Sequence, residues 1–125
     1  MNVKINTKER FHAITLPGTT LTATMSDDLE NYLLPFLQNE VKNIVLILKD
    51  IQNIDDAAAK KLIHIQQKYN NNNVSFVICE LQDKVKSNLG ESGLLEMMNI
   101  TPTESEAGDI VQMEEIEREL MEGED

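Results

Sequence analysis

The chain has 125 residues, 41% of them hydrophobic, and one cysteine, which allows one domain with a modest core and excludes an internal disulfide or a cysteine zinc site. The net charge is −11, and residues 104–125, with ten acidic residues and one arginine, carry −9 of it. Binding to nucleic acid or to an anionic membrane requires lysines and arginines, so the composition argues against both and favours a basic or apolar protein partner.

Two strands are predicted at the start of the chain, at residues 3–7 and 11–16, because apolar and polar residues alternate there. Residues 7–10 form the turn between them, and Pro17 and Gly18 end the second strand. Residues 1–10 lack the features of a signal or transit peptide, and no apolar run approaches the ~18 residues of a membrane span. We therefore expect a cytoplasmic protein without membrane insertion.

A first helix should begin near Ser26, where Thr24 and Asp27 have the spacing of a capping box. Pro35 cannot donate a backbone hydrogen bond, so it should kink this helix or end it by Leu34, leaving a loose turn after it. Residues at helical spacing make the apolar side: Met25, Leu29, Tyr32, Leu33 and Phe36.

The centre of the chain combines a buried strand, a short loop and a helix. Residues 44–48 are an unbroken apolar run, typical of a parallel strand covered on both faces. Asp55 is a good N-cap for a helix that starts at Asp56, and this helix has an apolar side made by Ala58, Leu62, Ile65 and Tyr69. A helix start attracts anions, so the two aspartates act either as plain caps or as a functional negative charge.

The remaining elements alternate between strand and helix. Four asparagines at residues 70–73 predict a turn, residues 74–80 a second buried strand, residues 82–89 a short helix, and residues 99–101 an edge strand. This order predicts an α/β fold with a mostly parallel sheet of four to five strands and helices packed against it. We expect a domain at residues 1–103, followed by an acidic C-terminal helix and tail at 104–125.

The C-terminal helix should start after Pro102, where Thr103 and Glu106 have capping-box spacing. The favoured interpretation is that Ile116 and Leu120 pack on the sheet while the carboxylates stay in water. The alternative is that the helix extends beyond the domain and binds a partner or a second copy. Residues 122–125 are expected to be disordered in either case.

The cysteine and the two histidines do not suggest a catalytic or metal site. Cys79 follows an apolar strand pattern and is expected to be a buried thiol rather than a nucleophile. His12 and His64 belong to no ligand-spaced cluster, so each is expected to be a half-exposed polar residue. Asp55 and Asp56 are adjacent and point about 100° apart on a helix, so they do not form a facing acid/base pair. We expect no enzyme activity and no cofactor.

The chain resembles a STAS domain, the domain of sulfate transporters and anti-sigma factor antagonists, over essentially its whole length. The resemblance rests on the apolar strand and loop that end at Asp55, on the strand at residues 74–79, and on the third helix at residues 82–86 with its following Gly93-Leu94 step. It implies a STAS-type mixed sheet in a bacterial, cytoplasmic regulator of transcription. STAS domains fused to anion transporters are excluded as a direct match.

The resemblance implies a function by partner switching. In bacterial members the unphosphorylated domain binds an anti-sigma factor with a GHKL-type kinase fold, which frees the sigma factor. The kinase then phosphorylates a serine or threonine at the start of the second helix, in an Asp-Ser-x-Gly context, and ends the binding. In this chain Asp55 matches the family's aspartate, Asp56 the phospho-acceptor and Ala58 the glycine, with Ala57 between them.

Asp56 has no hydroxyl, so the switch cannot operate here as the family runs it. Ser75 is the only serine or threonine between Lys49 and Lys86. Asp56 supplies about one negative charge where a phosphoserine carries ~1.5 to 2. It either imitates the phosphorylated, released state or is a second capping carboxylate in a domain that binds without regulation.

Two binding functions follow from the resemblance. In the first, the chain is an anti-sigma factor antagonist or decoy that no kinase controls. In the second, it is a small STAS subunit that docks on another ATPase, such as that of an ABC lipid-transport complex. The expected partner-binding residues lie opposite the loop at residues 17–22 and are Asp55, Asp56, Ala57, Ala58, Lys60 and Lys61.

Overall fold

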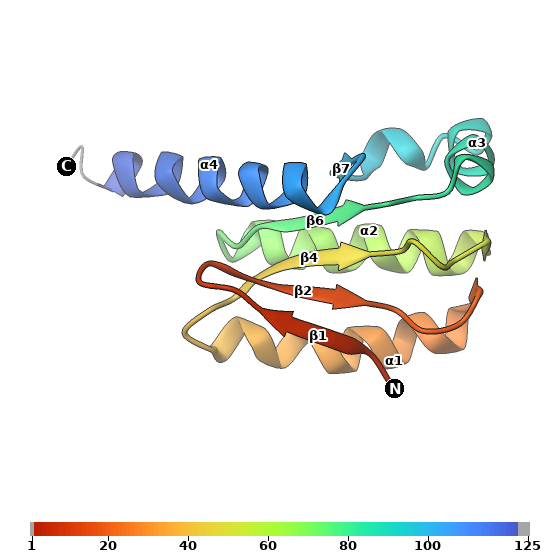
Figure 1. The fold of residues 1–125 in the computed structure, drawn as a ribbon, viewed down its shortest axis with the longest axis horizontal. Helices are drawn as coiled ribbons and strands as arrows, with labels where there is room; N and C mark the ends of the chain where they lie inside the picture. Colours follow the sequence, from red (N-terminus) through yellow and green to blue (C-terminus); the bar gives the residue numbers. More distant parts are fainter. Residues whose placement is uncertain (1, 123–125) are drawn as a thin grey trace.

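The computed structural model describes residues 2–122, and its centre is a five-stranded sheet (Figure 1). The strands occur in the order β1-β2-β4-β6-β7. β1 is antiparallel to β2, and every other neighbouring pair is parallel. The mostly parallel sheet of four to five strands is therefore confirmed. The strand bounds are β1 Lys4–Thr7, β2 Phe11–Thr15, β4 Asn43–Ile47, β6 Phe76–Cys79 and β7 Ile100–Thr101.

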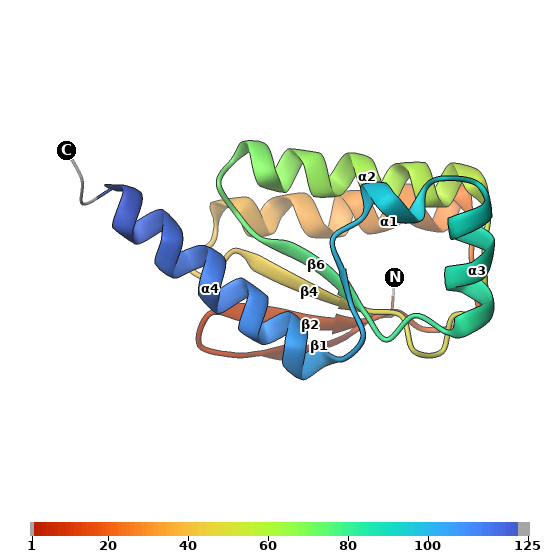
Figure 2. The same ribbon diagram turned by 90° about the horizontal axis from the view of Figure 1, so that it is seen from above.

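Helices cover both faces of the sheet (Figure 2). α1 and α2 lie side by side on one face, and α4 crosses the other face. α3 lies near the edge where the parallel strands end. The helix bounds are α1 Ala23–Leu33, α2 Asp56–Asn71, α3 Asp83–Glu91 and α4 Glu104–Glu122, with short 3-10 helices η1 Leu34–Gln38 and η2 Leu95–Met97.

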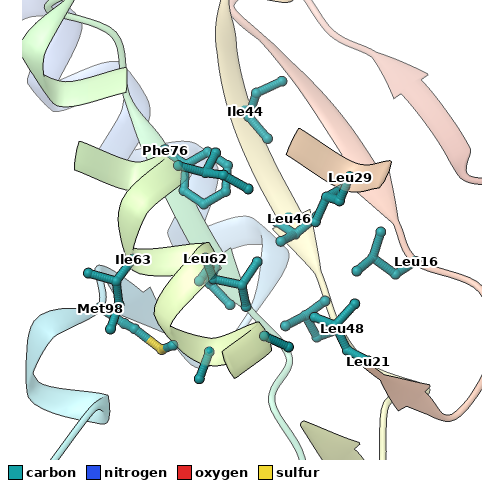
Figure 3. Packing of buried hydrophobic residues seen from close by; sticks show 14 of the residues in the cluster. Leu16, Leu21, Leu29, Ile44, Leu46, Leu48, Leu62, Ile63, Phe76 and Met98 are labelled. Atoms are coloured by element: carbon teal, nitrogen blue, oxygen red, sulfur yellow. The ribbon is translucent and has the colours of Figure 1, made fainter. Parts of the chain in front are cut away.

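The main core lies between the sheet and the α1–α2 layer. Figure 3 shows Leu29 of α1, Leu46 of β4 and Leu62 of α2 meeting there. The predicted apolar side of α2 is confirmed, because its four residues are fully buried. The Tyr69 hydroxyl also donates a hydrogen bond to the Leu33 carbonyl at a distance of 2.7 Å, and this bond joins α2 to the end of α1.

The core on the other face is smaller. Short side chains of three strands, such as Ala13, Val45 and Val77, pack there against Ala107 and Val111 of α4. Gly108 brings the helix close to the sheet, because a Cβ at this position would lie 3.3 Å from two ring carbons of Phe11. The lack of a side chain at Gly108 therefore lets α4 pack closely on the Phe11 ring.

Helix ends agree with the sequence predictions in part. α1 ends at Leu33 and continues as the 3-10 helix that contains Pro35, as predicted. The predicted cap of α1 is wrong, because the helix starts at Ala23 and Thr22 accepts from the Met25 N–H at 3.3 Å. α2 extends to Asn71, and the turn that follows requires a left-handed backbone only at Asn73, with φ of 59°.

Two further predictions are wrong, both concerning burial. His12 is buried rather than half-exposed: its Nε2 donates to the Val41 carbonyl at 2.9 Å, and its Nδ1 lies 2.9 Å from the Thr7 hydroxyl. Ile116 and Leu120 do not pack on the sheet, since 41% and 65% of their surfaces are exposed. Helix geometry explains the second error, because Leu120 follows the buried Val111 by nine residues, a rotation of about 180° around the axis.

None of the helices within residues 2–122 combines the length and hydrophobicity that a membrane crossing needs.

Candidate functional site

The start of α2 is held in place by Asp55. Its backbone is extended, and its Oδ1 accepts from the Ala58 N–H at 2.7 Å, which confirms the predicted N-cap. Its own N–H donates to the Leu21 carbonyl at 3.3 Å. Both the side chain and the backbone of Asp55 are therefore used to build the fold.

Asp56 lies in a different environment from Asp55. Asp55, Asp56 and Ala57 are all exposed, but the carboxylate of Asp56, the first residue of α2, makes no hydrogen bond or ion pair within residues 2–122. Ala58 is fully buried and packs in the main core, so the matched glycine position has no access to a partner. Of the four residues from Asp55 to Ala58, Asp56 is thus the charged side chain that remains available at the positive end of the helix dipole.

A small two-stranded ribbon supports this helix start. β3 (Thr20–Leu21) pairs in parallel with β5 (Asn53–Ile54), and the N–H groups of Gln52 and Asn53 both donate to the Thr19 carbonyl. The pairing brings the loop at residues 17–22 against the start of α2, as the sequence predicted. We call the resulting exposed surface the α2 entry surface; its residues are Thr19, Thr20, Asn53, Asp56, Ala57 and Lys60.

Lys61 has a structural role in the α1–α2 layer. Its Nζ lies 3.2 Å from Asp27 Oδ1 and 3.3 Å from Glu30 Oε1, and Lys68 reaches the other oxygen of Glu30 at 3.0 Å. Burial opposes the ionised form of Glu30, but the two ammonium groups hold the pKa of this carboxyl below its ordinary value. Lys60, one residue earlier, is exposed and belongs to the α2 entry surface.

A shallow groove continues the α2 entry surface along α2. It has a volume of about 310 Å³ and runs between α2 and the segment that contains η2. Met97 is 53% exposed at its edge, so the groove adds an apolar contact to the polar helix start. The lining residues are Lys60, Ile63, His64, Gln67, Leu94 and Met97.

The thiol of Cys79 and the hydroxyl of Ser75, which lie at opposite ends of β6, are both buried. Burial raises the pKa of the Cys79 thiol to about 12, with a further contribution from the carboxylates of Glu80 and Glu104, so the thiol is protonated at neutral pH. Ser75 is 1% exposed, and its Oγ accepts from Arg118 at 3.1 Å. Within residues 2–122, no group of three or more His, Cys, Asp or Glu side chains is placed to hold a metal ion.

The fold is shared with solved structures of bacterial regulators. A protein of Thermotoga maritima assigned as an anti-sigma factor antagonist is 20% identical, with a TM-score of 0.76 over 88% of this chain and 94% of that one. RsbS of Moorella thermoacetica, carrying a serine-to-glutamate substitution, is 19% identical, with a TM-score of 0.73 over 90% and 96%. No curated protein sequence matches the chain.

The anti-sigma factor antagonist SpoIIAA has the same fold. Its unphosphorylated form is 17% identical, with a TM-score of 0.68 over 89% of this chain and 96% of that one. Its phosphorylated form, from Bacillus, has a TM-score of 0.62 over 88% and 99%, at 16% identity. The family model of the STAS domain matches residues 2–107. The chain therefore belongs to the STAS domain family.

The sequence did not predict two features of this site. The β3–β5 ribbon has two-residue strands, which are too short to produce an alternating pattern. The groove depends on Met97, which is distant in sequence from α2. The only sign of this groove in the sequence was an apolar methionine in a segment that is too short to form a core helix.

Proposed function

We propose that this chain is a protein-binding regulatory module of the anti-sigma factor antagonist type, and that it binds its partner through the α2 entry surface without control by phosphorylation. The observation that supports this proposal most directly is that two adjacent aspartates have different roles. The Asp55 carboxylate is used as the helix cap, whereas the exposed Asp56 carboxylate makes no hydrogen bond or ion pair within residues 2–122 and lies where the family resemblance places the phospho-acceptor.

The shape and chemistry of the surface support a protein partner. It combines the exposed hydroxyls of Thr19 and Thr20, the Asp56 carboxylate, the Lys60 ammonium and the apolar edge at Met97. Such a mixture of apolar and polar groups on a nearly flat surface is typical of a non-obligate protein interface. The groove is shallow and open, and both the Cys79 thiol and the Ser75 hydroxyl are buried, which supports binding rather than catalysis.

The absence of a hydroxyl on Asp56 supports constitutive binding. Ser75, the only serine or threonine between Lys49 and Lys86, is inaccessible in the folded chain and accepts a hydrogen bond from Arg118. The segment around the phospho-acceptor position therefore offers no alternative hydroxyl to a kinase. One carboxylate also carries less charge than a phosphate, which favours the bound over the released state.

The partner in this proposal is an anti-sigma factor with a GHKL-type ATP-binding fold. The chain spans nearly the full length of the antagonists it resembles, which supports this class of partner. The alternative partner of the same surface is a different ATPase, such as that of an ABC lipid-transport complex. The experiment below distinguishes this partner from an anti-sigma factor.

The experiment is affinity capture from the native cell lysate with mass spectrometry. The baits are the wild-type chain, Asp56→Ser, and Met97→Gln as a variant of the groove. We expect the wild type and Asp56→Ser to capture the same GHKL-fold protein in equal amounts. We expect Met97→Gln to capture several-fold less of it, since it puts a polar amide in place of an apolar anchor of the interface, and the loss of such an anchor costs about 1 kcal/mol or more.

The other outcomes contradict distinct parts of the proposal. Capture of the GHKL protein by Asp56→Ser alone would show that Asp56 imitates the phosphorylated state and silences the domain. Capture of an ABC ATPase by all three baits would reject the antagonist role. Equal capture by wild type and Met97→Gln would place the interface elsewhere on the molecule.

A further inference from the structure

α4 has two apolar sides that follow each other along the helix. Ala107 and Val111 face the sheet and are fully buried. Past residue 112 the apolar residues occur on the opposite side, because Ile116 is rotated by about 140° from Val111 and Leu120 by about 180°. We call this second side the outer stripe; its residues are Met113, Ile116 and Leu120, with exposed fractions of 56%, 41% and 65%.

The helix is longer than the sheet that it crosses. Its 19 residues span about 28 Å, whereas the four residues of β6 span about 13 Å. Figure 2 shows the C-terminal turns of α4 extending beyond the sheet. The outer stripe lies on this C-terminal half of α4, where the rest of the described domain does not cover its side chains.

Polar contacts at both ends set the rotation of α4. Glu80 Oε2 accepts from the Glu104 N–H at 2.8 Å at the start of the helix. Arg118, near the other end, donates to Ser75 Oγ at 3.1 Å and to Asn43 Oδ1 at 3.4 Å. With Arg118 bound to the sheet edge, the outer stripe must face away from the domain.

The charges beside the outer stripe are of one sign. Glu117 and Glu119 lie on either side of it, about 70° to 90° around the axis from its centre, and Asp109 precedes it on the same side of the helix. Arg118 is the only basic residue of α4, and its guanidinium is turned to the sheet. The stripe therefore has acidic flanks and no cation of its own.

We propose that the outer stripe binds a helix of another protein whose apolar side is flanked by lysines or arginines. Three apolar residues at spacings of three and four residues match the side of a helix that packs against another helix. The acidic flanks complement basic ones and repel both an anionic membrane and a second copy of α4. The α1–α2 layer lies on the other face of the sheet, so this site is independent of the α2 entry surface.

The test uses a fluorescent synthetic peptide as the probe. It has leucines at heptad spacing with lysines beside them, and its control is a peptide of identical composition in scrambled order. The full chain is compared with the triple variant Met113→Gln, Ile116→Gln, Leu120→Gln by fluorescence anisotropy. We expect the triple variant to bind the helical peptide at least about tenfold more weakly, and Met97→Gln to bind it like the wild type.

Charge is tested separately, which keeps the proposal falsifiable if the triple variant does not fold. The variant Glu117→Gln, Glu119→Gln leaves the outer stripe intact and should weaken binding by several-fold, with a smaller dependence on salt than in the wild type. Circular dichroism checks that each variant is folded.

Three results would overturn the proposal. The scrambled peptide would bind as tightly as the helical one if charge alone were responsible. The triple variant would bind like the wild type if the outer stripe were not used. Sedimentation would reveal a dimer that the triple variant abolishes if the stripe were occupied by a second copy of the chain.

Discussion

α2 and α4 begin in the same way but differ in how much of their length is buried. Each is capped by a side-chain oxygen that accepts from the N–H three residues later, at 2.7 Å for Asp55 and Ala58 and at 3.1 Å for Thr103 and Glu106. α2 then buries residues along its whole length, from Ala58 to Tyr69. α4 buries only Ala107 and Val111, both in its first half. Capping thus predicts where a helix begins but not how much of it belongs to the core.

The phase of the apolar residues makes the difference. In α2 the spacings of four, three and four residues keep the apolar side chains on one side of the helix. In α4 the two-residue interval between Val111 and Met113, a rotation of about 200°, moves the apolar residues to the other side. A helix with this change of phase buries apolar residues at one end and leaves those of the other end exposed, where we propose that a partner binds.

The largest expected effect contrasts one leucine in each helix. Leu62→Ala in α2 should lower the free energy of unfolding by about 2–5 kcal/mol, because it creates a cavity in the main core. Leu120→Ala in α4 should change it by no more than about 0.5 kcal/mol, since the side chain is exposed. Urea denaturation of both variants measures this. Comparable losses would show that the end of α4 packs on the domain.

The attachment of α4 by Arg118 can be removed on its own. Arg118→Gln should cost about 1–2 kcal/mol, because the Ser75 hydroxyl loses its charged donor at a buried position. Hydrogen exchange should accelerate in α4 after residue 112 and stay unchanged in α2. Arg10→Gln is the matched control, since its ion pair with Glu115 at 3.4 Å is partly exposed and should contribute less than about 1 kcal/mol. Uniform exchange across α4 in Arg118→Gln would contradict this attachment.

The two aspartates at the start of α2 should differ in their contribution to stability. Asp55→Ala removes the cap of the Ala58 N–H and should cost about 1 kcal/mol. Asp56→Ala removes only a favourable charge at the helix dipole, with an expected cost of a few tenths of a kcal/mol. Thermal unfolding of the two variants and of Asp55→Asn, which keeps a capping oxygen, measures the difference. An equal cost would mean that Asp56 shares the cap.

The smallest expected effect concerns the ion pairs that join α1 to α2. The pKa of Glu30 is lowered in the folded chain from an ordinary value of 4.5, so its contribution is fully present above pH 4.5 and is lost as the pH falls through the folded value. Glu30→Gln should cost at most about 1 kcal/mol at pH 6. In urea denaturation, the difference between wild type and variant should shrink below pH 4.5. A constant difference down to pH 3 would show that the Glu30 charge contributes nothing.

Local signals in the sequence predicted much of the fold. The apolar runs identified β4 and β6 as buried parallel strands, Pro35 predicted the end of α1 by Leu34 with a loose turn after it, and Asp55 was recognised as the cap of α2. These features depend on hydrogen bonds and side-chain periodicity within a few residues, so neighbouring residues contain the information. The family resemblance added the expectation that Asp56 occupies the phospho-acceptor position.

Contacts between distant residues required the tertiary structure. His12 is buried because the Val41 carbonyl, 29 residues later, accepts from its ring, and the β3–β5 ribbon forms because Thr19 meets Asn53 across the chain. The position of the outer stripe of α4 depends on both local signals and distant contacts. Its rotation relative to Val111 follows from helix geometry, but which side of α4 meets the sheet follows from contacts with Phe11, Ser75 and Asn43. The sequence by itself determined the strands of the main sheet, the helices and their order, through local hydrogen bonding and periodicity. Only the tertiary structure decided which surfaces are covered and which remain for a partner, because burial depends on groups far apart in the chain.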